Sequence, residues 1–206
     1  MSEDTEIDPD LLREEVSQIK DAMGIQERYP SRFRFWLVTG LAVLLASSAS
    51  QLIALRELSG SLHAVAWWVP LGVAGLYQWW STDNSDATVT EAKPRIGVLW
   101  LSVFALYFVF LVTLTPVLDG MNGAAGEILL FSLIVGLVGV GYLVVGEALR
   151  AYYIRRRDRW AFYIGGGWML TLAALMPNVD IFQTWGYATF GIAFAIHAVV
   201  SYLALK

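Results

Sequence analysis

Six long apolar runs separated by short polar connections constrain this 206-residue chain more than any other feature. A helix needs about 20 mostly apolar residues to cross the hydrocarbon core of a bilayer. The runs cover residues 35–55, 64–80, 96–118, 128–149, 160–176 and 185–205, of which the second and fifth are short for a full crossing. The sequence therefore predicts an all-α integral membrane protein with six transmembrane helices, arranged as three tandem hairpins in residues 35–206.

The Lys and Arg residues indicate how these helices are threaded. Thirteen of the fourteen fall in the N-terminal tail, in alternate loops or at the C-terminus, and Arg56 is the one exception. An excess of Lys and Arg marks the cytoplasmic loops of a polytopic protein. We therefore expect a multi-pass protein of the cell membrane, with its N-terminus and C-terminus in the cytoplasm.

Composition excludes several classes of function. The chain is 57% hydrophobic and 16% charged, and its lack of Cys excludes disulfides, thiolate metal sites and cysteine nucleophiles. Two His and scattered carboxylates give no metal-ligand spacing, and there is no glycine-rich phosphate loop. We expect no cofactor, no nucleic-acid partner and the lipid bilayer as the main contact. The acidic, Lys-poor composition resembles that of proteins from halophilic archaea.

The N-terminal tail, residues 1–34, holds the one substantial element outside the predicted spans. Asp8, Pro9 and Gly24 suit the start and end of a cytoplasmic amphipathic helix over about residues 9–23. Its apolar residues recur every three or four positions and form one narrow stripe, made of Leu12, Val16, Ile19 and Met23. This stripe should pack against the protein's own cytoplasmic face, a second copy or another protein.

Few polar residues fall inside the predicted spans, and such residues are candidates for function. His197 lies in the sixth span and could relay protons or sit neutral and hydrogen-bonded within the bundle. Ser47, Ser48 and Gln51 lie in the outer half of the first span, where they could line a cavity or join helices. Glu147, near the inner end of the fourth span, completes the candidate intramembrane polar site.

Arginines gather in the predicted inner loop between the fourth and fifth spans. Besides orienting the chain, they could contact the head groups of anionic lipids, and they are Arg150, Arg155, Arg156, Arg157 and Arg159. Glu147 precedes Arg150 by three residues, so the two side chains can pair on one helix face.

Two segments suggest an internal repeat. Residues 114–119 and 175–180 both read Leu-x-Pro-x-x-Asp at the outer end of a predicted span. Proline followed by aspartate is a general helix-stop signal, so the match reflects either that signal or duplication of a helical hairpin. In the fifth span, the three glycines at 165–167 could kink the helix or allow close packing.

No catalytic group can be assigned, so we expect a non-enzymatic scaffold, regulatory or accessory subunit. The alternative is a transporter or channel for a small solute or ion, favoured by the Ser/Gln face, His197 and the hairpin repeat. Convergence of His197, Gln51 and Ser47 on one polar cavity would favour transport. Dispersed and individually satisfied polar groups would favour the scaffold.

Overall fold

The structure is a bundle of long helices. The computed structural model describes residues 33–80, 95–118, 120–121, 123–152 and 154–205, together with positions 12, 15, 16 and 19 of the tail. The elements are α2 (Phe33–Leu55), α3 (Ser61–Trp80), α4 (Ile96–Leu118), α5 (Gly123–Ala148), the short 3-10 helix η2 (Leu149–Tyr152), α6 (Arg156–Leu175) and α7 (Asp180–Leu205). The all-helical prediction is confirmed for the described part of the chain, which contains no strand.

Four of these helices are long and apolar enough to cross a membrane. They cover Trp36–Leu55, Ile96–Leu118, Ala125–Tyr152 and Asp180–Leu205. The other two, α3 and α6, do not reach the same apolarity. The first turn of α6 is highly charged and α3 contains Pro70, His63 and Gln78. The structure thus supports a helical membrane protein through four helices rather than the six that were expected.

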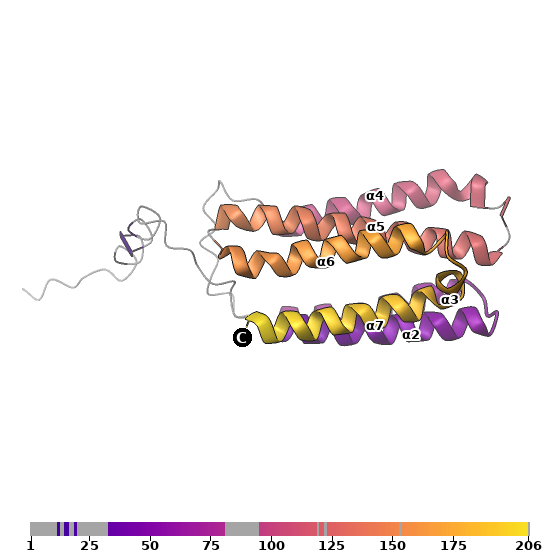
Figure 1. Cartoon of the computed structure of the whole chain (residues 1–206), viewed down its shortest axis with the longest axis horizontal. Coiled ribbons are helices and arrows are strands. Elements are labelled where there is room, and N and C mark those ends of the chain that lie inside the picture. Colours follow the sequence, from indigo (N-terminus) through magenta and orange to yellow (C-terminus); the bar gives the residue numbers. More distant parts are fainter. Residues whose placement is uncertain are drawn as a thin grey trace, which may run out of the picture.

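Two groups of three helices make up the bundle. In Figure 1, α4, α5 and α6 lie together above α7, α2 and α3. Helix α7 packs mainly on α2, and α6 packs mainly on α5, whereas α6 and α7 touch only sparingly. Consecutive helices are close neighbours in the α2–α3 and α4–α5 pairs, but α6 and α7 are not. The packing therefore does not support three equivalent hairpins.

Small residues let the two closest helix pairs approach. A Cβ atom built on Gly40 of α2 would lie 2.6 Å from the Cβ of Ala198 on α7. Similarly, a Cβ on Gly166 of α6 would lie 2.7 Å from the backbone oxygen of Gly139 on α5. Helix pairs in membranes commonly use such small residues, because van der Waals contact replaces the hydrophobic driving force there.

Aromatic side chains fill the space between the two groups. Trp36 of α2 contacts Phe162 of α6 with ring centroids 5.3 Å apart, and Phe131 of α5 contacts Tyr187 of α7 at 4.3 Å. Large rings separate the helices of the two groups, whereas glycines allow the helices within each group to approach closely. The core is therefore an aromatic layer between two tightly packed helix pairs.

The two Leu-x-Pro-x-x-Asp segments have different structures. Pro116 lies inside α4, which continues to Leu118, whereas α6 already ends at Leu175 and Pro177 lies in the following turn. Asp180 begins α7. The matching residues therefore lie at different positions relative to the ends of their helices. This difference favours a local helix-stop signal over a duplicated hairpin.

Candidate functional site

The polar residues predicted within the spans do not share one site. Gln51 lies near the C-terminal end of α2, where its Nε2 donates to the Thr184 backbone oxygen of α7 at 2.9 Å. Its Oε1 accepts from the Ala188 backbone N–H at 3.0 Å. Both polar atoms of the amide are engaged between helices. Ser48, three residues earlier on α2, is exposed and faces away from the bundle.

His197 lies at the junction of the two helix groups. Its ring is within 6.2 Å, centroid to centroid, of Trp36 on α2, Tyr142 on α5 and Trp168 on α6. Its Nε2 is buried and has no hydrogen-bond partner among the described residues. The same Nε2 edge of the ring faces Gly165 of α6, where a Cβ would lie 2.8 Å from Nε2. His197 thus occupies an aromatic enclosure rather than a polar cavity.

Ser47 belongs to the tight α2–α7 contact. A Cβ built on Gly191 of α7 would lie 2.6 Å from the Ser47 Cβ, and the Ser47 side chain is buried. Its Oγ has no hydrogen-bond partner among the described residues. Gln51 and Ser47 therefore lie along the α2–α7 contact, whereas His197 lies between the two helix groups.

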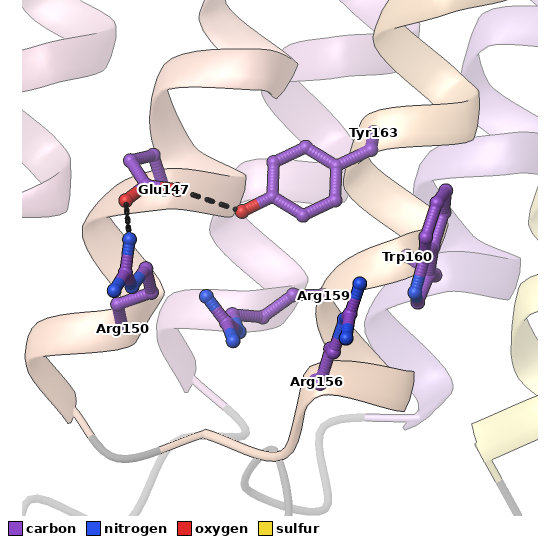
Figure 2. Close-up of a pocket in the computed structure, with 6 residues that line it drawn as sticks. All are labelled: Glu147, Arg150, Arg156, Arg159, Trp160 and Tyr163. Carbon is purple, nitrogen blue, oxygen red and sulfur yellow. Dashed lines mark hydrogen bonds and ion pairs between the residues drawn. The ribbon is translucent and has the colours of Figure 1, made fainter.

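The fifth predicted polar residue, Glu147, lies in a different place, at an open pocket between the ends of α5 and α6. The pocket encloses about 540 Å³ and is lined by Glu147, Arg150, Arg156, Arg159, Trp160 and Tyr163. Figure 2 shows Tyr163 and Arg159 of α6 directed toward the Glu147 and Arg150 side of the pocket. The structure thus joins one predicted polar residue with three of the five predicted lipid-binding arginines.

Hydrogen bonds organise one side of this pocket. Arg150 donates from Nη1 to Glu147 Oε1 at 2.8 Å, and the Tyr163 hydroxyl donates to Glu147 Oε2 at 2.9 Å. The same hydroxyl lies 3.1 Å from the Gly146 backbone oxygen. Both carboxylate oxygens of Glu147 are therefore engaged, one by each helix, as the dashed lines in Figure 2 indicate.

The sequence predicted the four charged residues that line the pocket as site residues, but not the two aromatic ones. Arg155 and Arg157 are exposed but do not line the pocket. Trp160 and Tyr163 were not predicted as site residues, because the fifth span was expected to begin only at Trp160. Since α6 begins at Arg156, four lining residues fall at i, i+3, i+4 and i+7 of one helix face. That spacing was the available signal.

A second polar contact joins the two helix groups at their other end. His63 of α3 stacks on Tyr187 of α7, with centroids 5.1 Å apart and planes at 21°. Its Nε2 lies 3.8 Å from Oε2 of Glu127 on α5. Neither His63 nor Glu127 was predicted as a site residue, because the sequence places them in two different predicted loops.

The tail stripe is described at three of its four positions. Leu12, Val16 and Ile19 are helical and exposed, whereas Met23 lies outside the described residues. Among the described residues, no group of three His, Asp or Glu side chains is placed to hold a metal ion. Comparisons of the chain with protein-family models, curated proteins and solved structures find no match.

Proposed function

We propose that this chain is a non-enzymatic scaffold, regulatory or accessory subunit of the cell membrane. In this proposal all six helices cross the bilayer and both termini lie in the cytoplasm. The Lys and Arg distribution supports the orientation. The lengths of α3 and α6, 20 residues each, support the crossings, because 20 residues of helix span about 30 Å, the thickness of the hydrocarbon core.

The main support for the proposal is that the side-chain amide of Gln51 is hydrogen-bonded through both of its polar atoms to a neighbouring helix. A transport path needs polar atoms that face a passage and exchange partners with a solute. The Gln51 amide instead binds two backbone groups of α7, Thr184 O and Ala188 N. The most polar side chain of the first span thus contributes to helix adhesion, which is what a structural bundle requires.

The N-terminal stripe supplies the interaction surface of the proposed scaffold. Leu12, Val16 and Ile19 recur at helical spacing and are exposed. A short isolated helix is marginal in water, so such a stripe is stabilised when a partner covers it. We propose a protein partner in the cytoplasm, either a second copy of this chain or another membrane or cytoplasmic protein.

Substitution of the stripe tests this role. Leu12→Asp with Ile19→Asp should abolish co-purification of the partner or self-association of the full chain in mild detergent. Glu15→Ala, at an exposed position of the same helical segment, is the matched control and should leave the complex intact. A full chain that stays monomeric and captures no protein, with both variants silent in cells, contradicts the proposal.

Self-association has a clean direct assay, because the chain contains no Cys. A single Val16→Cys substitution should yield a cross-linked dimer in membranes if the partner is a second copy. A heterologous partner should yield an adduct of another mass.

Transport of a small solute or ion is the second candidate. Its support is the set of buried polar atoms without hydrogen-bond partners among the described residues: Ser47 Oγ, Ser50 Oγ and His197 Nε2. Solute or ion flux into proteoliposomes that His197→Ala and Ser47→Ala both reduce would favour transport. Flux no greater than in protein-free vesicles would exclude it for the solutes tested.

A further inference from the structure

The pocket between α5 and α6 has a positive electrostatic balance. Three arginines and one glutamate line it, for a formal net charge of +2 (three minus one). Glu147 is already bound by Arg150 and Tyr163, at 2.8 and 2.9 Å. Arg159 lies close enough to act electrostatically on both Glu147 and Tyr163, but its Nε is buried and has no hydrogen-bond partner among the described residues. A buried guanidinium N–H without an acceptor is uncommon in proteins, and an anion oxygen in the pocket would satisfy it.

The start of α6 carries an arginine at its N-cap position and a carboxylate, Asp158, in its first turn. Arg155 occupies the N-cap position and makes no side-chain capping bond, as expected of a guanidinium, which can only donate. The N-terminal end of a helix carries a partial positive charge and free N–H groups, which favour anions. Because the Asp158 carboxylate offsets the partial charge of the helix end, the three lining arginines are the main source of the anion preference.

An apolar surface continues from the pocket toward the middle of the two helices. Val144 and Val140 lie on the Glu147 face of α5, one and two turns away respectively, and both are exposed. Ile164, one turn beyond Trp160 on α6, is also exposed. Trp160 itself is half exposed at the pocket, where a membrane–water interface favours tryptophan. An anionic region beside an apolar one matches an amphiphile.

We propose that this pocket binds the phosphate group of an anionic membrane phospholipid, whose acyl chains lie along Val140, Val144 and Ile164. Arg156 and Arg159 contact the phosphate, because guanidinium groups form paired hydrogen bonds to phosphate oxygens. Trp160 packs beside the glycerol region. This inference goes beyond the proposed scaffold role and depends only on α5 and α6 lying in the bilayer.

Lipid selectivity of the full chain tests the site. Purified protein is reconstituted in vesicles of phosphatidylcholine containing a small fraction of brominated phosphatidylglycerol or brominated phosphatidylcholine, and tryptophan quenching is measured. Because the chain has nine tryptophans, subtracting the signal of Trp160→Phe isolates the pocket. We expect quenching of Trp160 to favour phosphatidylglycerol, with a preference that falls about fivefold for each lining arginine removed.

Two pairs of substitutions separate a built site from general surface charge. Arg156→Gln with Arg159→Gln removes two charges that line the pocket. Arg155→Gln with Arg157→Gln removes two charges from the same segment that do not line it. The first pair should lose the preference and the second should keep it at about 0.15 M salt, where the Debye length is ~8 Å. Equal losses from both pairs would overturn the proposal.

Two further arms complete the test. Glu147→Gln raises the pocket's net charge by one and should strengthen the preference for phosphatidylglycerol. The Glu147→Gln variant can be measured even if the double arginine variant fails to fold. An unchanged or weaker preference for phosphatidylglycerol would count against the site. Inorganic phosphate at millimolar concentration should not displace the lipid. Full displacement would assign the pocket to a soluble phosphate compound and overturn the lipid assignment.

Discussion

The side-chain amide of Gln51 on α2 and the backbone N–H of Ala188 on α7 are joined by a hydrogen bond of 3.0 Å. The same amide donates to the Thr184 oxygen at 2.9 Å. Thr184 and Ala188 are the two residues that pair directly in an uninterrupted α-helix. Between them, Trp185 has non-helical angles, φ −113° and ψ 17°, so α7 is kinked there. Gln51 thus bridges the two backbone groups at the kink.

Replacing Gln51 with leucine should destabilise the bundle. Leucine keeps the approximate size of the side chain but leaves two backbone groups of α7 without their side-chain partner. We expect the free energy of unfolding to fall by about 1–3 kcal/mol, measured by denaturant titration in detergent micelles. The control is Ser48→Ala, on an exposed position of the same helix, which should change stability by less than about 0.5 kcal/mol. Equal effects of the two variants would contradict the bridging role.

The glycines of α6 should respond very differently to alanine. A Cβ on Gly165 would lie 2.7 Å from Tyr142 Cδ1 and 2.8 Å from His197 Nε2, whereas a Cβ on Gly167 meets nothing within 4 Å. Gly165→Ala should therefore cost about 1–3 kcal/mol through overpacking. Gly167→Ala should be neutral or gain up to about 1 kcal/mol from helix propensity.

Thermal unfolding of the two variants side by side measures this difference. A double variant, Gly165→Ala with His197→Ala, opens space for the new methyl group. It should be less destabilised than the sum of its two single variants. Strict additivity would show that the methyl group does not meet His197.

At the other end of the bundle, ring stacking should contribute more to stability than the contact between His63 and Glu127, which is an ion pair only when His63 is protonated. His63 stacks on Tyr187 at 5.1 Å, and aromatic pairs contribute about 0.5–1.5 kcal/mol beyond burial. The Glu127 side chain is 42% exposed and 3.8 Å from His63, and exposed pairs contribute about 0–1 kcal/mol. We expect His63→Phe to preserve stability and His63→Ala to lower it by about 1–3 kcal/mol. A Glu127→Gln variant as unstable as His63→Ala would reverse this ranking.

Membrane topology can be mapped with single cysteines, since the chain has none of its own. If all six helices cross, an impermeant maleimide should label Ser59→Cys, Met121→Cys and Asn178→Cys from outside intact cells. Ser85→Cys and Arg157→Cys should react only after permeabilisation. Labelling of Ser85→Cys from outside would show that α3 does not cross the bilayer, and labelling of Asn178→Cys only from inside would show the same for α6.

The apolar runs predicted the ends of a helix correctly where the helix begins and ends with the apolar run itself. The third predicted span, residues 96–118, coincides with α4. The fifth was predicted from residue 160, yet α6 begins at Arg156, because charged residues that are typical of a loop form its first turn. The sixth was predicted from residue 185, which is the kink, whereas α7 begins at Asp180.

The sequence alone therefore determined the class of the protein, because a run of about 20 apolar residues is a local property that needs no knowledge of its neighbours. The three-dimensional structure was needed to show that α7 packs on α2 and α6 on α5. It also showed that Gln51 contacts Ala188, 137 positions away in the sequence, and that arginines from two segments share one pocket. Helices that are apolar on nearly every face carry little periodic signal of which face is buried. Their pairing depends on where glycines and large rings fit one another in space.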